Sequence, residues 1–358
     1  MALSQVGLER LNTATTDKIG KNKNKIINGQ MICSQRGSSF TSDGYTLDRF
    51  ERQQSSDGAF TVTQSTTSPD DFANSLKVDV TTADTSLAAA QYAQIKYKIE
   101  AQDLQDLAFG TSAAKTVTLS FYVRSNKTGN YAFAIQQSDN SFKQASFQYA
   151  ISSADTWERK TITIAGDTSG VINNDTGDGF ILLWALAAGT NLTSGSTRST
   201  FTTRVAADQY AGQGVNLLDS TSNEWYITGV QLEVGSVATD FEHRSFAQEL
   251  ELCKRYYLRL TRGGSNTMLF TGCTKADTYI CFSRIELPVT MRTVPSISFT
   301  GTRNIRNYSN DNSGFSGETI SENSFLIRWG SSTGITDGAA YTAELTGNPN
   351  FVEVSAEL

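Results

Sequence analysis

Side chains suited to acid–base or nucleophilic chemistry are scarce in this 358-residue chain. Its single histidine is His243, so any serine or cysteine activated through an imidazole must use this residue. His243 stands in "DFEHRS", where an exposed polar side chain is the ordinary expectation. The sequence contains no motif for a serine nucleophile elbow, a zinc protease or a phosphate-binding loop. We therefore expect that the protein is not an enzyme.

Glycan hydrolysis is the one reaction that the carboxylates could support. Glycosidases need two carboxyl groups about 5 to 9 Å apart in a groove. Candidate pairs are Glu224 with Glu233, and Asp240 with Glu242. Acidic residues are plentiful in a chain of net charge −6, and the sequence places neither pair in a groove. Glycan degradation is thus the less favoured interpretation.

The cysteines give no sign of a metal centre. Cys33, Cys253, Cys273 and Cys281 include no C-x-x-C pair, and one histidine cannot complete a zinc site with them. The first twenty residues carry an early acidic residue and lack the apolar core of a secretory signal, so a disulfide framework is not expected. We expect buried free thiols in a protein made in a reducing cytoplasm.

Aromatic side chains could bind a sugar, because the C–H face of a sugar ring stacks on a flat ring. In "EWYITGVQLEV" strict alternation predicts a core face made of Tyr226, Val230, Leu232 and Val234. The opposite face would then present Trp225, Ile227, Gln231 and Glu233. This second face is a candidate glycan groove, and the alternative is that a loop or a neighbouring subunit covers it.

Other aromatic and charged residues extend this prediction. Alternation places Tyr122 and Arg124 on the second face of their own strand. Trp157 and Trp184 are expected in the core, whereas Trp329 ends a strand near the C-terminus and could lie in a core or contact a glycan.

Strands must position these residues, and the composition favours them, with abundant Gly, Ser, Thr and Asn. Alternation predicts strands at 76–80, 91–101, 116–126, 129–137, 156–164, 179–190 and 224–234. The segment 179–190 is apolar on both faces, which indicates a central strand, and 191–222 is polar and loop-like. Strands at this spacing without helices between them indicate an antiparallel sandwich.

A short helix follows the last of these strands. Ser245 and Gln248 have the spacing of a capping box. The predicted apolar stripe consists of Phe246, Leu250, Cys253 and Tyr257. The helix either closes the first sandwich or meets two copies of itself around a threefold axis. Beyond it, strands at 267–274, 278–287, 295–301, 324–330, 339–345 and 351–358 predict a second β-sandwich.

Charge and hydropathy exclude two classes of partner. A net charge of −6 provides no basic surface for a nucleic acid. No apolar run approaches the roughly 20 residues that a membrane span needs, so we expect no membrane insertion.

Four blocks, in a fixed order, resemble a widespread group of phage virion proteins. They are "INGQMICSQRGSSFTSDGYTLDRF", "TLSFYVRSNKTGNYAFAIQ", "GVQLEVGSVATDFEHRSFAQELELCKRYY" and "LPVTMRTVPSIS", and together they span residues 27–298. Members of the group look like phage tail fibres or other structural proteins, and their first domain is similar to jelly-roll carbohydrate-binding modules. The resemblance implies a β-sandwich, a virion location and a homotrimer, and it carries over no activity.

The resemblance also implies one possible ion. Jelly-roll binding modules often hold a structural Ca²⁺, and Glu233, Asp240 and Asp48 are the candidate ligands by position. Without EF-hand spacing, solvated carboxylates are the favoured interpretation, and no other cofactor is expected.

These observations predict a mainly β protein with four parts. Residues 1–25 are an arm that attaches to other virion proteins, 26–243 a jelly-roll domain, 244–257 a linking helix and 258–358 a C-terminal β-sandwich. The expected function is that of a phage tail fibre or receptor-binding component that contacts a host surface polysaccharide. The alternatives are a capsid decoration or collar protein that binds only other virion proteins and, less favoured, a glycan-degrading tailspike.

Overall fold

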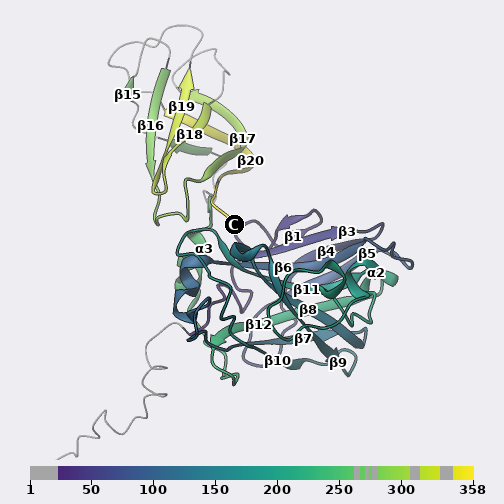
Figure 1. Cartoon of the computed structure of the whole chain (residues 1–358). Coiled ribbons are helices and arrows are strands. Elements are labelled where there is room, and N and C mark those ends of the chain that lie inside the picture. Colours follow the sequence, from purple (N-terminus) through teal and green to yellow (C-terminus); the bar gives the residue numbers. More distant parts are fainter. Residues whose placement is uncertain (1–22, 262–266, 271–273, 276–279, 307–314, 331–341) are drawn as a thin grey trace, which may run out of the picture.

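The computed structural model describes residues 23–358, apart from 262–266, 271–273, 276–279, 307–314 and 331–341 (Figure 1). The regular structure is mainly antiparallel β, which confirms the predicted fold class. Figure 1 shows two bodies of sheet that meet near helix α3 (Phe246–Lys254) and the C-terminus. Most of the predicted N-terminal arm lies outside the described residues.

Two six-stranded sheets form the first domain. Sheet A has the order β1-β4-β5-β12-β7-β10. Its strands are β1 (Ser39–Phe40), β4 (Ala59–Ser65), β5 (Ser75–Thr82), β12 (Glu224–Val234), β7 (Val117–Ser125) and β10 (Glu158–Ile164). Sheet B has the order β2-β3-β6-β11-β8-β9. Its strands are β2 (Gly44–Tyr45), β3 (Phe50–Ser55), β6 (Tyr92–Glu100), β11 (Asp178–Ala188), β8 (Gly129–Gln137) and β9 (Lys143–Ile151).

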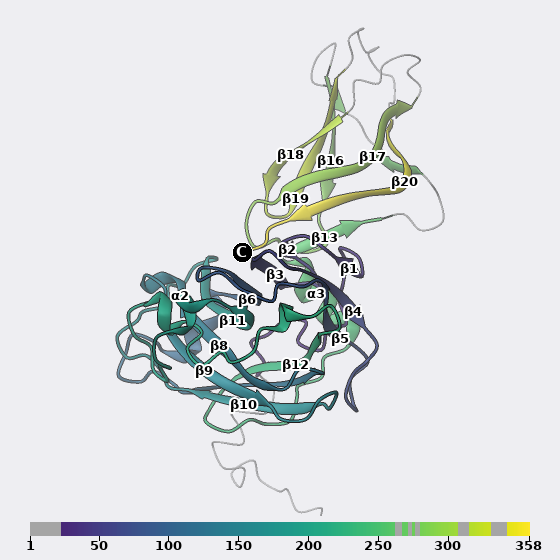
Figure 2. The ribbon, with the colours of Figure 1, turned by 90° about the vertical axis from the view of Figure 1, so that its right-hand side faces the viewer.

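The chain passes repeatedly from one sheet to the other, for example from β5 to β6, from β6 to β7 and from β7 to β8. The sheets therefore close over one core as a jelly roll (Figure 2). Short helical turns lie in the connections: η2 (Ala101–Leu107), η3 (Ser138–Asn140), α2 (Thr190–Thr193), η4 (Ala206–Asp208) and η5 (Leu217–Asp219). No helix in the described part of the chain has the length and apolar character that a membrane span requires.

Large aromatic rings from both sheets fill the core. Trp184 is fully buried, as predicted, and its ring lies 5.2 Å from that of Phe133 and 6.0 Å from that of Phe121. Such tilted and edge-to-face pairs stabilise the fold by about 0.5 to 1.5 kcal/mol each beyond the burial of their area.

Strand β11 is apolar on both faces because both are covered. Its inward residues join the main core, while Ile181 and Leu183 lie on the outer face of sheet B. Leu192 and Tyr210, from the connection between β11 and β12, pack over this outer face. The central position of β11, between β6 and β8, agrees with the prediction from its sequence.

The turn "GDTSG" is built around one nearly buried carboxylate. Asp167 accepts hydrogen bonds from the Ser169 backbone at 2.9 Å, from Lys143 at 2.7 Å and from Gln137 at 2.9 Å. Burial alone would raise the pKa of Asp167, but the hydrogen bonds, with that from Lys143 the strongest, lower its pKa to about 2.

Asp167 should therefore make stability depend on pH in acid. Its pKa in the folded protein lies below the ordinary 3.8, so its stabilisation is present above about pH 4 and lost as the pH falls towards 2. The loss should amount to about 2 kcal/mol. We expect Asp167→Asn to remove this part of the pH dependence in urea unfolding, whereas Asp175→Asn, in the next turn, should not. An Asp167→Asn protein that loses as much stability in acid as the wild type would contradict this assignment.

Helix α3 begins with the predicted capping box. The Gln248 backbone donates to the Ser245 hydroxyl at 3.3 Å, and the Gln248 side chain accepts from the Ser245 backbone at 3.0 Å. The predicted apolar stripe is only partly correct, because Cys253 is buried but the Phe246 side chain is 57% exposed.

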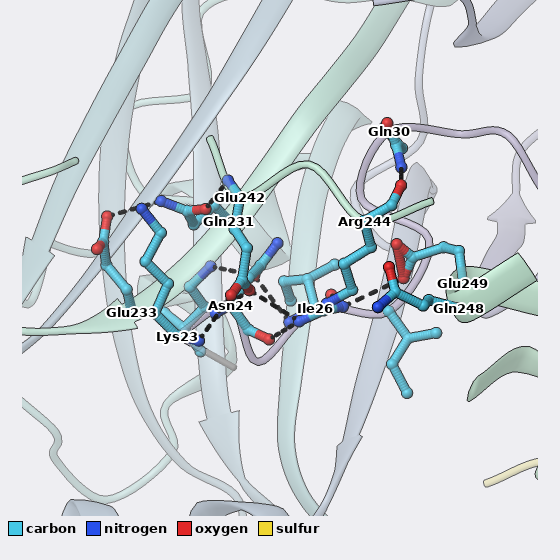
Figure 3. Close-up of polar contacts among 12 residues, drawn as sticks. Lys23, Asn24, Ile26, Gln30, Gln231, Glu233, Glu242, Arg244, Gln248 and Glu249 are labelled. Carbon is cyan, nitrogen blue, oxygen red and sulfur yellow. Dashed lines mark hydrogen bonds and ion pairs between the residues drawn. The ribbon is translucent and has the colours of Figure 1, made fainter. Parts of the chain in front are cut away.

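A buried glutamate explains which face of the helix turns inward. Glu249 is 2% exposed, accepts from the Asn28 backbone at 2.9 Å and pairs with Arg244 at 3.2 Å (Figure 3). These bonds fix the helix against the N-terminal segment of the sandwich. Sequence periodicity predicts hydrophobic residues on this face, because it takes no account of a buried carboxylate that an ion pair neutralises.

The second domain is also a β-sandwich. One sheet contains β13 (Tyr257–Leu260), β14 (Thr267–Phe270), β17 (Ser296–Arg306) and β20 (Thr342–Ser355), and all three of the others pair with β20. The other sheet has the order β15-β16-β19-β18, with β15 (Thr274–Lys275), β16 (Ile280–Glu286), β19 (Ser324–Gly330) and β18 (Phe315–Ser321). Phe325, Ile327, Val352 and Val354 are among its buried core residues.

The chain end ties the two domains together. Glu357 forms ion pairs with Arg49 and, at 3.0 Å, with Arg36, both from the first domain. The Arg49 guanidinium also lies 3.5 Å from the centre of the Tyr256 ring and donates to the Lys98 carbonyl at 2.8 Å. This junction is polar and buried, and ion pairs to Glu357 hold both arginines.

Candidate functional site

The outer face of sheet A differs from its prediction because β12 contains a bulge. The pairing of β12 with β7 shifts between Thr228 and Gln231, and Gly229 takes a φ of +60°. The extra residue shifts the alternation, so Trp225, before the bulge, lies on the same core side as Val230 and Leu232 after it. Trp225 is therefore fully buried. The prediction that Trp225 contacts a glycan is therefore wrong. An isolated glycine inside a strand pattern was the available signal.

Tyr122 and Arg124 do lie on this outer face. Arg124 pairs with Asp155 at 2.8 Å, and its guanidinium lies 5.0 Å from the centre of the Tyr226 ring. Tyr226, predicted in the core, lies beneath this guanidinium instead. Trp157, also predicted in the core, is half-buried, and the centre of its ring lies 6.1 Å from that of the Tyr226 ring. Arg124 is thus held by the protein's own groups.

Gln231 and Glu233 are covered by the chain's own corner. Gln231 is fully buried and Glu233 is 3% exposed. The Gln231 amide oxygen accepts from the Glu242 backbone at 2.8 Å, and Glu233 accepts from the Thr239 backbone at 2.8 Å (Figure 3). These two residues fasten the corner to the sheet, so the covered-face alternative applies at this end of β12.

The three candidate calcium ligands do not come together. Asp48 lies on the side of the second domain, where its carboxylate accepts hydrogen bonds from the Gln35 backbone at 3.0 Å and from the Gln35 side chain at 2.8 Å. Glu233 instead accepts from the Thr239 backbone in the corner before α3. The Asp240 side chain faces a separate pocket. Within the described residues, no group of three or more His, Cys, Asp or Glu side chains could hold a metal ion.

The carboxylate pairs are also unsuited to glycoside hydrolysis. Glu224 and Glu233 lie nine residues apart on one strand, which separates them by roughly 30 Å. Glu242 is bound by the backbone N–H groups of Lys23 at 3.2 Å and Asn24 at 3.0 Å, and it pairs with Arg244 at 3.1 Å. The side chain of Trp329, near the end of β19, lies outside the described residues.

A cleft of about 270 Å³ lies instead on the outer face of sheet B. Its floor contains the apolar side chains of Ile181 and Leu183 from β11. Its walls combine amides, one phenol and two cationic groups. These wall residues are Gln53, Tyr92, Gln94, Lys96, Gln136, Arg204 and Gln209.

Strand register places the amides next to one another. Gln53 of β3 pairs with Gln94 of β6, and the Gln94 side chain donates to that of Gln53 at 2.6 Å. On the other side of the floor, Gln136 of β8 lies opposite Ile181 and donates to Gln209 at 3.3 Å. The Tyr210 hydroxyl, beneath the wall, also bonds to Gln94. The wall is therefore preorganised.

The connection between β11 and β12 forms the far side of the cleft. It is anchored on β9, because Gln144 and Thr202 exchange two backbone hydrogen bonds of 2.9 Å. Arg198 pairs with the buried Asp208 at 3.0 Å and holds the same segment. Arg204 and Gln209 thus reach the cleft from a fixed loop. The sequence identified this segment only as polar and loop-like.

Arg204 supplies the positive charge of the cleft that no acidic side chain neutralises among the described residues. Lys96 is neutralised by Glu51 at 2.8 Å, whereas exposed Arg204 has no acidic partner among the residues that the structure describes. Burial, followed by the nearby Asp43 and Glu51 charges, raises the pKa of Tyr92, so its phenol stays neutral and able to donate. No described carboxylate lines the cleft.

This arrangement suits a hydroxylated ligand. Each amide offers donors and an acceptor, the apolar floor can meet the C–H face of a ring, and the site lacks a carboxyl pair for acid–base hydrolysis. The sequence did not predict the cleft, because alternation shows which residues point outward but not which strands lie side by side. Glutamines recurring at outward positions of three strands were the signal.

Comparisons with known proteins find similar folds only. No family model and no curated protein matches the chain. An enzymatically active domain of tailspike protein 4 from bacteriophage CBA120 is 12% identical over 59% of this chain and 21% of its own, with a TM-score of 0.34. The chain thus spans about a fifth of that protein.

Two sugar-binding structures are also similar. A family 11 carbohydrate-binding module from Clostridium thermocellum, in complex with a mixed-linked tetrasaccharide, is 13% identical over 57% of this chain and 98% of its own, with a TM-score of 0.28. A putative sugar-binding protein from Bacteroides thetaiotaomicron is 11% identical over 60% of this chain and 100% of its own, with a TM-score of 0.31.

Proposed function

We propose that the protein binds a glycan in the cleft on sheet B and does not cleave it. The observation that carries the proposal is the cleft itself: four amides, a neutral tyrosine and an arginine without an acidic partner among the described residues, around an apolar floor. Sugar ligands need such a mixture of directional hydrogen bonds and apolar contact.

We further propose that this binding serves a phage virion, with the protein as a tail fibre or receptor-binding component. The four ordered sequence blocks support this role, and they also favour a homotrimer attached through its N-terminal arm to other virion proteins. The host surface polysaccharide would be the ligand.

Replacing Tyr92 and Arg204 in the wall of the cleft should weaken glycan binding. We expect the double variant Tyr92→Ala/Arg204→Ala to weaken binding at least tenfold, since a stacked ring and a charged donor are lost together. Binding would be measured on a glycan array and by calorimetry with the oligosaccharides that the array identifies.

Arg124→Ala is the matched control, because Arg124 is an arginine on the outer face of the opposite sheet. It should bind as the wild type does. If Arg124→Ala abolished binding and the double variant retained it, the glycan would lie on sheet A and the proposal would be wrong. Reducing ends released from a bound polysaccharide would contradict the non-enzymatic part.

A further inference from the structure

A second pocket, of about 520 Å³, lies on the outer face of sheet A, over the bulge in β12. Three aromatic rings and the imidazole of His243 line it. Phe72 comes from the connection between β4 and β5, Tyr122 from β7, and Phe241 and His243 from the corner that precedes α3. Three segments that are far apart in the sequence thus bring these rings together in one pocket.

The bulge creates the space for these rings. A Cβ atom on Gly229 would stand 2.7 Å from Cζ of Phe72 and 2.9 Å from Cδ2 of Tyr122, closer than such atoms can approach. Only glycine therefore allows Phe72 and Tyr122 to close over the strand at this point. Its φ of +60° is likewise a conformation that glycine adopts without strain.

The rings support one another. The centre of the Phe72 ring lies 5.4 Å from that of Tyr122, 5.1 Å from that of Phe241 and 5.2 Å from that of His243. The Phe241 and His243 rings are 4.9 Å apart. Phe72, Tyr122 and Phe241 are half-buried, so the cluster is a fixed surface with part of its area open to the pocket.

Charged groups surround this aromatic surface. Asp71 and Asp240 are exposed, and within the described residues their carboxylates have no hydrogen-bonding or ion-pair partner. The Arg159 guanidinium, in contrast, is held by the Thr239 carbonyl and lies 6.0 Å from the centre of the Tyr122 ring. The acceptors that remain free are therefore the two carboxylates.

We propose that this pocket is a second carbohydrate site, which binds one pyranose ring that is neutral or carries an amine. The aromatic rings meet the C–H face of the sugar, and the two carboxylates accept hydrogen bonds from its hydroxyl or ammonium groups. The two carboxylates outweigh the single positive charge of Arg159, so the pocket disfavours an acidic sugar. The pocket and the cleft on sheet B lie on opposite faces of the sandwich, so the two sites bind independently.

His243 provides a direct readout, because it is the only histidine in the chain. The imidazole NMR signals of the full-length protein would be followed while glucose, N-acetylglucosamine, glucosamine or glucuronic acid is added. We expect the neutral and amino sugars to move these signals and glucuronic acid to leave them in place. Phe241→Ala should weaken the response about tenfold, which corresponds to the loss of one stacked ring.

Two further variants make the result specific. Phe246→Ala removes an exposed ring at the start of α3, outside the pocket, and should respond as the wild type does. Arg204→Ala, in the cleft on sheet B, should also leave the His243 response intact, so failure of the cleft and failure of the pocket are distinguishable. Signals that no sugar of the panel moves, or a response unchanged in a folded Phe241→Ala protein, would overturn the proposal.

Discussion

Trp225→Ala should lower the free energy of unfolding by about 3 to 5 kcal/mol, the cost of removing a large buried aromatic ring. Trp225 lies in the main core between sheets A and B, where its side chain is fully buried. Strand β12 is paired on both sides, by β5 and β7, so the sheet cannot collapse fully into the cavity left by the indole. Urea unfolding monitored by circular dichroism would measure the loss.

The control for this variant is Trp157→Ala. Trp157 is half-buried on the outer face of sheet A against Tyr226, so its removal should cost no more than about 1 to 2 kcal/mol. Trp225→Phe, which keeps most of the apolar volume, should fall between the wild type and Trp225→Ala. A stable Trp225→Ala protein with weakened glycan binding would show that the indole lies at the surface and that the assignment of the bulge is wrong.

Glu357→Ala should destabilise the junction between the domains by about 3 to 5 kcal/mol, because it leaves a buried charge without its partner. The Arg49 side chain is 1% exposed and that of Glu357 is 6% exposed. Burial alone would lower the pKa of Arg49, but the Glu357 carboxylate and the nearby Tyr97, Tyr256 and Tyr45 together raise this pKa. The Arg49 guanidinium therefore remains charged and needs the carboxylate.

Differential scanning calorimetry would test this junction. We expect Glu357→Ala to separate one cooperative transition into two, as the second domain loses its main polar tie to the first. Glu286→Ala is the matched control, since Glu286 pairs with Arg284 where both side chains are exposed, and it should change stability by no more than about 0.5 kcal/mol. Equal behaviour of the two variants would contradict a structural role for the buried pair.

Much of the fold could be predicted because alternation is a local property. Strands β6 and β7 follow from the alternation of apolar and polar residues, and β11 follows from an unbroken apolar run. The capping box of α3 needs only Ser245 and Gln248. The sequence did not predict β3 and β9. Both strands carry several glutamines, which weaken the alternation of apolar and polar residues.

The candidate site depended on features that are not local. One residue inserted at Gly229 reverses the faces of Trp225 and Tyr226, and strict alternation cannot include such an insertion. The buried Glu249 accepts from the Asn28 backbone, which lies 221 residues away in the sequence and comes beside it only in the folded protein. The cleft itself requires that β3, β6, β8 and β11 lie side by side, an order that no single segment encodes.

A crystal structure of the protein with an oligosaccharide selected on the glycan array would test the central claim most directly. The account predicts a sugar ring over Ile181 and Leu183, with its hydroxyl groups within hydrogen-bonding distance of Gln94, Gln136 or Gln209 and with an intact glycosidic bond. An oligosaccharide bound only elsewhere on the protein, with the cleft on sheet B empty, would contradict it.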